Sequence, residues 1–224
     1  MANNRNIEDE VRQAIVKGEF SPSMALRMEA LKARFDVGFS PIREALSSLV
    51  SEGLVDLIPN KGFRVAALSR EDLEDVAFAR LAVEQAALAR AIERGDAQWE
   101  SQIVAAMHLY RRTAETAFDS EAALREWEFA HDDLHRSLIS ACGSSRLMDF
   151  QRKLQEQHVR YRRLIVLEDV GPHAHIEEHE KLVALVLERN IDAAHAEIEK
   201  HLRITVDALV ASYFWEEKPA VKLS

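Results

Sequence analysis

No proline occurs between Gly62 and Gly171, and only Gly95 and Gly143 interrupt that stretch with glycine. Because proline and glycine are the residues that break helices, the stretch predicts long helices joined by short turns. Three of the five prolines and four of the seven glycines lie instead in residues 1–68. We therefore expect two domains, residues 1–68 and residues 69–224, of which the second is all-helical.

The charge distribution changes at the same boundary. The chain has a formal net charge of −9, which taken alone argues against nucleic acid as a partner. Residues 1–68, however, carry nine basic and nine acidic residues, so the whole excess of acid lies in residues 69–224, together with all nine histidines. Because the distribution of charge decides the partner, the first domain remains a candidate for binding DNA.

Composition excludes several classes of protein. Hydrophobic residues make up 47% of the chain, enough to build a core, yet no run approaches the roughly 18–20 apolar residues that span a bilayer. The first ten residues are polar and acidic, unlike a signal peptide. A single cysteine, Cys142, excludes an internal disulfide and a cysteine-based zinc site. We expect a cytoplasmic globular protein with no membrane partner.

Start and stop residues divide the second domain into about six helices. Ser69-Arg-Glu-Asp72 resembles a capping box, and Gly95 ends the helix that follows it. Similar signals predict helices over residues 69–94, 96–118, 120–142, 144–169, 173–189 and 191–213. The fold class expected for the whole chain is mainly α, with a bundle of six to seven antiparallel helices after the first domain.

The first domain shows the order of elements of a winged helix-turn-helix. Helices are predicted over residues 7–16 and 28–35, and a third is predicted to start with Ser40 as N-cap and Pro41 at the first helical position. Two short runs, 54–58 and 63–65, flank a turn and predict a small β-hairpin. In this arrangement the third helix enters the major groove and the hairpin, or wing, lies along the DNA backbone. The candidate DNA-binding residues are Ser40, Pro41, Arg43, Lys61, Gly62 and Arg64.

The same residues resemble a known family. Val37-Gly-Phe-Ser-Pro-Ile-Arg-Glu-Ala-Leu46 and Asn60-Lys-Gly-Phe-Arg-Val65 are similar to the DNA-binding domain of GntR-type bacterial transcription regulators. Ser40, Pro41, Arg43 and Gly62 match the family pattern. Gly38 and Phe39 replace its usual Ser and Arg, and that Arg commonly contacts the operator. The resemblance therefore implies DNA binding, with a changed readout at position 39.

Histidines recur on the inward stripes of three predicted helices. His131 and His135 are four residues apart, so both lie on one face and can chelate one ion. His179 and His201 lie on the apolar stripes of two later helices, and His158 can line the same cavity. A metal is the simplest way to keep several imidazoles together inside a bundle, because unpaired buried polar groups are costly. The alternative is a set of hydrogen-bonded core histidines.

The second domain resembles the all-helical FCD effector domain of the FadR subgroup of GntR regulators, and the resemblance covers about residues 7–210. It implies a metal site at His135, His179 and His201, with His131 at the position where the subgroup has Asp. Four histidines suit Zn²⁺ or Ni²⁺.

Arg80 also lies on an apolar stripe, where it either pairs with Glu84 or receives an anion. Family members with this pattern use such an arginine, with others on the fourth bundle helix, to bind a carboxylate above the metal. Arg160 and Arg162 are the candidates there, and we take Arg160 with Arg80 as the effector-binding residues.

Three functions follow from these patterns. The first is a ligand-responsive transcription regulator, a repressor, that binds a palindromic operator as a homodimer and responds to a small carboxylate. The second is a constitutive dimeric DNA-binding protein whose bundle is purely structural. The third is a metal-dependent hydrolase, from the pair His131-Asp132, but adjacent helical residues point about 100° apart and the chain shows no activated nucleophile and no phosphate-binding loop. We therefore expect no enzymatic activity.

Overall fold

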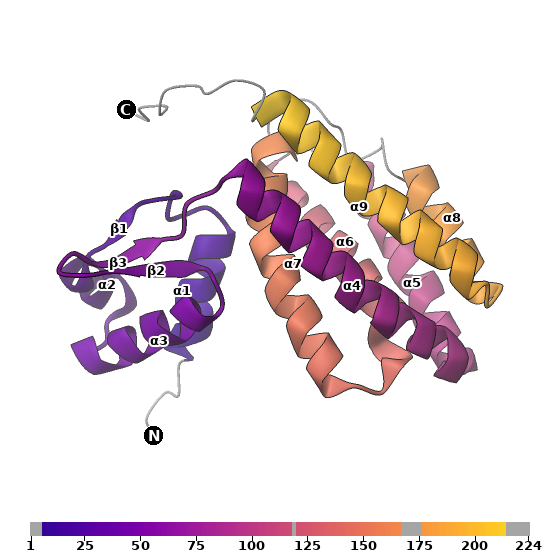
Figure 1. Cartoon of the computed structure of the whole chain (residues 1–224), viewed down its shortest axis with the longest axis horizontal. Coiled ribbons are helices and arrows are strands. Elements are labelled where there is room, and N and C mark those ends of the chain that lie inside the picture. The colour runs from indigo at the N-terminus through magenta and orange to yellow at the C-terminus, as the bar shows by residue number, and fades with distance from the viewer. Residues whose placement is uncertain (1–5, 118–119, 167–175, 214–224) are drawn as a thin grey trace.

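The computed structural model describes residues 6–117, 120–166 and 176–213. They form a small helical unit with one sheet, followed by a bundle of long helices (Figure 1). The mainly α fold, with a winged helix-turn-helix ahead of a helical bundle, is confirmed. Within the described ranges, no helix combines the length and the apolar character needed to cross a membrane.

The N-terminal unit consists of three helices and three short strands. The elements are α1 (Ile7–Val16), β1 (Ala25–Leu26), α2 (Met28–Phe35), α3 (Phe39–Ser51), β2 (Val55–Ile58) and β3 (Gly62–Val65). Apolar residues from all three helices and from the strands form one core, in which Ile15, Leu46, Leu49 and Val65 are buried. This core holds α3 and the β2–β3 wing as one rigid unit.

The sheet has one strand more than the predicted hairpin. Its order is β1-β3-β2, and β1 pairs antiparallel with β3 through Ala25 opposite Arg64 and Leu26 opposite Phe63. A strand of two residues is too short to produce the alternation by which strands are recognised in a sequence. The β2–β3 hairpin itself was predicted correctly, and its turn requires a positive φ of 83° at Gly62.

Helix α3 begins earlier than predicted. Gly38, in an extended conformation, is the N-cap and Phe39 is the first helical residue, so Ser40 lies inside the first turn and does not cap the helix. Glycine is an acceptable N-cap. Pro41 is tolerated at the third position because the first N–H groups of a helix have no intrahelical acceptor.

The bundle contains six α-helices in the described residues. They are α4 (Arg70–Arg94), α5 (Ala97–Ala114), α6 (Glu121–Ile139), α7 (Ser145–Val166), α8 (Ile176–Leu187) and α9 (Ile191–Tyr213), with a short 3₁₀ helix, η1 (Ser140–Cys142), after α6. The predicted caps at Ser69, Asp96 and Ser120 each accept a hydrogen bond from the backbone N–H three residues later. Helix α5 ends at Ala114, before the expected position. The boundaries expected near 169 and 173 lie outside the described residues.

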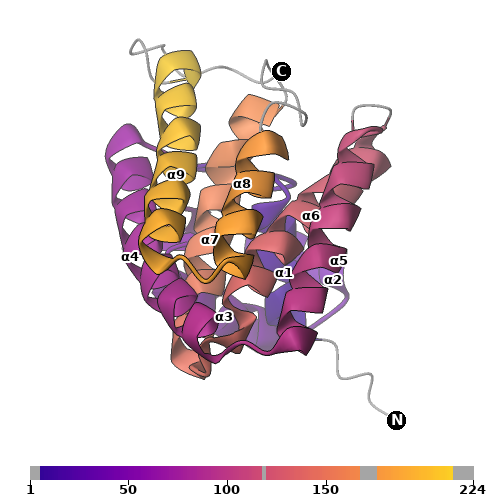
Figure 2. The same ribbon diagram turned by 90° about the vertical axis from the view of Figure 1, so that its right-hand side faces the viewer.

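Helix α4 packs against α7 and α9, while α5 packs against α6 (Figures 1 and 2). Helix α7 also reaches the N-terminal unit, where Val159 joins the core of that unit. One helix therefore contacts both parts of the molecule.

Candidate metal centre and nucleic-acid interface

The predicted DNA-binding residues lie in the first turns of α3 and on the wing. Ser40 and Arg43 are exposed in the first turns of α3, and Pro41 between them is half-buried. Lys61 and Gly62 are exposed at the tip of the wing, and Arg64 is exposed on β3. Exposed basic side chains on a recognition helix and a wing can reach base edges and phosphates.

Phe39 adds an apolar group to this surface. Its ring is 42% exposed at the first helical position of α3, and the Lys32 ammonium lies over the ring at 4.8 Å from its centroid. An aromatic side chain in the major groove contacts the methyl group of thymine rather than the acceptors of guanine.

Four histidines from three helices meet inside the bundle. His131 and His135 come from α6, His179 from α8 and His201 from α9, and all four are buried. One potential ligand atom from each ring lies within 4.8 Å of the others. The structure thus brings together all four residues that the sequence indicated as metal ligands.

The spacing of the rings fits a metal ion. Nε2 of His179 lies 3.3 Å from Nε2 of His135, and two nitrogens bound to one tetrahedral zinc at about 2.0–2.1 Å lie roughly 3.3–3.4 Å apart. Burial, followed by the positive charges of neighbouring groups, lowers the pKa of His131 and of His135 well below the ordinary value. Both rings are therefore neutral, the form that binds a metal.

Arg80 lies beside this cluster on α4. Its Nε donates to Glu84 Oε1 at 2.6 Å, and both side chains are almost completely buried. Nη2 of Arg80 is buried and has no hydrogen-bond partner among the described residues. Arg80 therefore pairs with Glu84 through Nε and still has Nη2 available to donate to an anion.

The second predicted effector residue has a different location. The Arg160 guanidinium donates to the carbonyl oxygen of Ala66, so it lies at the connection between the two parts of the chain and not beside the histidines. Arg162 takes the expected place: its Nη1 lies 2.6 Å from His131 Nδ1 and 3.1 Å from Asp132 Oδ1. Two residues of helix separate the two arginines by about 200°, and the sequence did not show which side faces the cavity.

Arg162 also has free donors. Its Nε and Nη2 are buried without a hydrogen-bond partner in the described part of the chain, as is Nδ1 of His158 from the same helix. His158 is 2% exposed, and burial lowers its pKa, with further contributions from Arg80 and Arg162. The side of the cluster formed by α4 and α7 therefore offers unused guanidinium donors, although each guanidinium also pairs with one carboxylate, Arg80 with Glu84 and Arg162 with Asp132.

The pair His131-Asp132 does not form a hydrolase centre. Asp132 accepts hydrogen bonds from Gln155 Nε2 at 2.8 Å and from Arg162, and it is not among the groups that converge with the three other histidines. Its carboxylate serves to hold side chains of α7 in place.

Helix α7 connects this cluster to the DNA-binding unit. His158 and Arg162 face the histidines, whereas Gln157 donates to the carbonyl oxygen of Glu52 at 2.7 Å and Arg163 donates to the carbonyl oxygen of Lys17. Tyr161 accepts a hydrogen bond from the N–H of Ser69, the residue that caps α4. Movement of α7 is thereby linked to α1, to the end of α3 and to the start of α4.

A buried ion pair strengthens the same contact. The Arg12 guanidinium on α1 donates to both carboxylate oxygens of Glu52 at 2.9 and 3.0 Å, and Glu156 of α7 lies 3.5 Å away. Desolvation opposes the charge of Arg12, but the bonds to Glu52 and Glu8 and the nearby carboxylates raise its pKa overall. Arg12 therefore remains charged and joins α1, α3 and α7.

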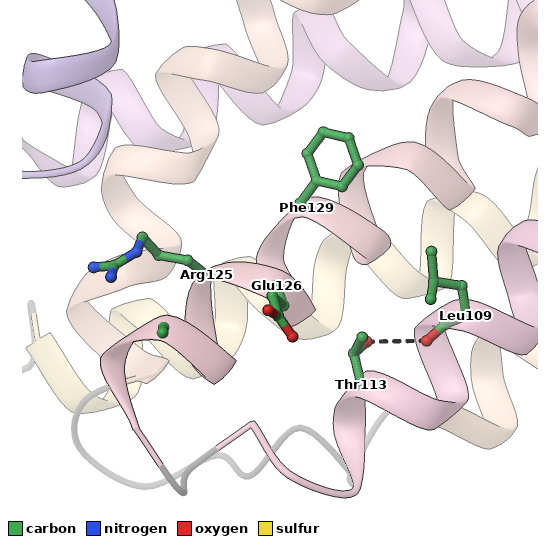
Figure 3. A pocket seen from close by; sticks show the side chains of 6 residues that line it. Leu109, Thr113, Arg125, Glu126 and Phe129 are labelled. Atoms are coloured by element: carbon green, nitrogen blue, oxygen red, sulfur yellow. Dashed lines mark hydrogen bonds between the residues drawn. The ribbon is translucent and has the colours of Figure 1, made fainter.

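An open groove lies between α5 and α6 (Figure 3). It has a volume of about 450 Å³ and is lined by Leu109, Thr113, Ala122, Arg125, Glu126 and Phe129. Phe129 is 65% exposed and Leu109 45% exposed. None of the predicted site residues lines this groove.

The sequence matches two known families along its length. Residues 3–65 match the bacterial regulatory proteins of the gntR family, and residues 75–204 match the FCD domain. The HTH-type transcriptional repressor GlaR of Escherichia coli (strain K12) is 34% identical over 197 residues, which cover 86% of this chain and 89% of that protein. BphR of Paraburkholderia xenovorans (strain LB400), an uncharacterized HTH-type transcriptional regulator, is 34% identical over 200 residues, covering 89% of this chain and 82% of that protein.

Solved structures agree on the fold. E. coli McbR/YncC superposes with a TM-score of 0.79 at 17% identity, covering 92% of this chain and 96% of that one. A transcriptional regulator of GntR type from Rhodococcus sp. RHA1 superposes with a TM-score of 0.74 at 21% identity, covering 95% and 100%. The relatives named by sequence are transcription regulators and not enzymes. The chain therefore belongs to the GntR family of bacterial transcription regulators, in the subgroup that carries an FCD domain.

Proposed function

We propose that this regulator is a repressor that responds to a small carboxylate held together with a divalent metal in the helical domain, residues 69–224. The observation that carries the proposal is the cluster of four buried histidines with convergent nitrogens, next to the unpartnered guanidinium donors of Arg80 and Arg162. Neutral imidazoles favour Zn²⁺ or Ni²⁺. A divalent metal held by these histidines would supply a Lewis acid, and the two arginines would supply charge-assisted hydrogen bonds to a carboxylate.

The N-terminal domain, residues 1–68, is proposed to read DNA through α3 and the wing. Arg43, exposed on α3, is proposed to bond to a guanine edge or to a phosphate, and Ser40 and Pro41 are proposed to approach the DNA backbone at the start of the helix. Lys61 and Arg64 are proposed to bind phosphates, while Gly62 permits close approach at the wing tip. The local basic side chains thus support DNA binding in spite of the acidic bundle.

A homodimer on a palindromic operator follows from the weak binding expected of one winged helix. We assign the second copy to the α5–α6 groove because two features there favour self-association. Leu109 and Phe129 expose apolar surface, and the neighbouring Arg125 and Glu126 carry opposite charges that a twofold axis can bring into contact across the two chains.

The signal is proposed to pass through α7. An anion that moves Arg162 acts on the same helix whose Gln157 and Arg163 hold the DNA-binding unit. A small rotation or shift of α7 would therefore change the pose of α1 and α3, and in a dimer the spacing of the two recognition helices.

A gel shift on the DNA upstream of the protein's own gene tests this function. The assay adds Zn²⁺ and a panel of short mono- and dicarboxylates to the wild type, to Arg80→Gln and to the double variant His135→Ala/His179→Ala. We expect at least one carboxylate to change operator affinity of the wild type, and neither variant to respond. Operator binding that no carboxylate alters, with or without metal, would support the constitutive alternative and reject the proposal.

A further inference from the structure

The four histidines are not equivalent, because His131 has a cationic neighbour at hydrogen-bond distance. Arg162 Nη1 lies 2.6 Å from His131 Nδ1. Every nitrogen of a guanidinium carries hydrogen and none can accept, so in this contact Nδ1 of His131 must accept. Asp132 Oδ1, an acceptor, also lies 3.3 Å from this Nδ1. It already accepts from Arg162 Nη1 at 3.1 Å, however, and the shorter contact to Arg162 leaves no room for a proton on Nδ1. In a neutral ring the proton then resides on Nε2.

A metal ligand must offer a lone pair, and in this arrangement His131 has none to spare. The lone pair on Nδ1 accepts from Arg162, and Nε2 carries the proton. This holds whichever of the two nitrogens faces the centre of the cluster. His135 and His179 instead face each other, with their Nε2 atoms 3.3 Å apart.

Electrostatic repulsion also disfavours a metal ion next to Arg162. A divalent ion among the histidines would lie within a few ångströms of the Arg162 guanidinium, and like charges repel at that range. An anion between them would attract both. A carboxylate is also a stronger acceptor for guanidinium than a neutral imidazole, and Nε and Nη2 of Arg162 are buried without a partner in the described residues.

We propose that Arg162 withholds His131 from the metal until an anion engages the guanidinium, so that metal and anionic effector bind cooperatively. The inference rests on the proposed metal site and adds a rule for its regulation. His135, His179 and His201 hold the ion first, and His131 becomes the fourth ligand when Arg162 turns to the anion. By linkage, the factor by which the anion tightens metal binding equals the factor by which the metal tightens anion binding.

A double-mutant cycle measured with Co²⁺ tests the inference. The affinity of the metal alone is measured by competition with a chromophoric chelator, and the Co²⁺ absorption spectrum reports coordination. His131→Phe keeps an aromatic ring against Tyr110 and Trp127 but removes both nitrogens. Arg162→Met removes the competing donor. Arg160→Met is the matched control, because its guanidinium contacts Ala66 on another side of α7.

We expect Arg162→Met to tighten Co²⁺ binding about tenfold or more and to shift the spectrum, and Arg160→Met to do neither. His131→Phe should weaken binding by no more than about threefold in the wild type, but by about tenfold or more in the Arg162→Met background. Equal effects of His131→Phe in both backgrounds would overturn the inference and leave the metal site intact. Failure of every variant and of the wild type to bind metal would overturn both.

A second measurement uses only the wild-type protein, so it does not depend on whether a variant folds. Nitrogen-15 NMR of selectively labelled histidine in the metal-free wild type reports which ring nitrogen of each residue is protonated. We expect His131 in the Nε2–H form, and succinate, used as the probe anion, to raise the Co²⁺ affinity. A proton on Nδ1 of His131 would refute the inference whatever the variants show.

Discussion

Buried histidines make the stability of the metal-free protein depend on pH. Burial is the first cause of the lowered pKa of His131, His135 and His158, so these rings stay neutral in the folded protein. In the unfolded chain they protonate near the ordinary pKa of about 6.5. Below that pH the unfolded state binds more protons than the folded state, so the stability present above pH 6.5 is lost as the pH falls.

The size of the effect follows from the number of rings. Between pH 7.5 and pH 5.5, each ring that protonates only on unfolding lowers the free energy of unfolding by about 1.4 kcal/mol. Three rings lower it by up to about 4 kcal/mol, a large share of the roughly 5–15 kcal/mol by which native proteins are stable.

Urea unfolding at several pH values, at one protein concentration and after removal of metal by a chelator, measures this loss. His158→Gln should reduce the loss by about 1.4 kcal/mol, because one ring fewer takes up a proton on unfolding. His108→Gln, on the exposed surface of α5, is the control and should leave the loss unchanged. Contributions from carboxyl groups cancel in the comparison between variants. A loss that is the same in His158→Gln and in the wild type would refute the reasoning.

Four further outcomes are expected. Arg43→Ala should weaken operator binding by about 1–3 kcal/mol in a gel shift with no change in circular dichroism; unchanged binding would exclude Arg43 from the interface. Phe39→Arg should change the sequences recovered from a random duplex pool, and identical sequences would show that position 39 does not read bases. Arg12→Met should destabilise the protein by about 3–5 kcal/mol in urea, because the buried carboxylate of Glu52 loses its partner; a change below about 1 kcal/mol would contradict this. Phe129→Glu should convert dimers to monomers in sedimentation, whereas an intact dimer would place the interface elsewhere.

Local signals in the sequence were sufficient for most helix boundaries. Ser69 caps α4 with its own side chain, and Gly95 ends the helix where the Trp99 ring lies so close that a Cβ would sit 1.9 Å from it. Such contacts involve residues a few positions apart, so they leave a pattern in the sequence. The two-residue strand β1 depends on its pairing with β3 and leaves none.

The candidate site could be predicted only in part, for the same reason. Helical periodicity placed His131, His135, His179 and His201 on inward faces, but how closely the four rings approach depends on the relative axial positions of three helices. Helical periodicity did not show which of Arg160 and Arg162 faces the histidine cluster. Helix α7 is covered on one side by that cluster and on another by the DNA-binding unit, so it has two buried faces. The contact between Arg162 and His131 was therefore not foreseeable from spacing.

The hydrogen bonds from α7 to backbone carbonyl oxygens of the N-terminal part of the chain have an evolutionary consequence. Gln157, Arg160 and Arg163 donate to the backbone carbonyl oxygens of Glu52, Ala66 and Lys17. Every residue type presents a backbone carbonyl, so these three bonds do not depend on which side chains occupy the receiving positions. The exposed residues of α3 and the wing can thus diverge toward a new operator while the attachment to α7 persists. For the proposed carboxylate-responsive repressor, a change of target gene and a change of effector can therefore be acquired separately.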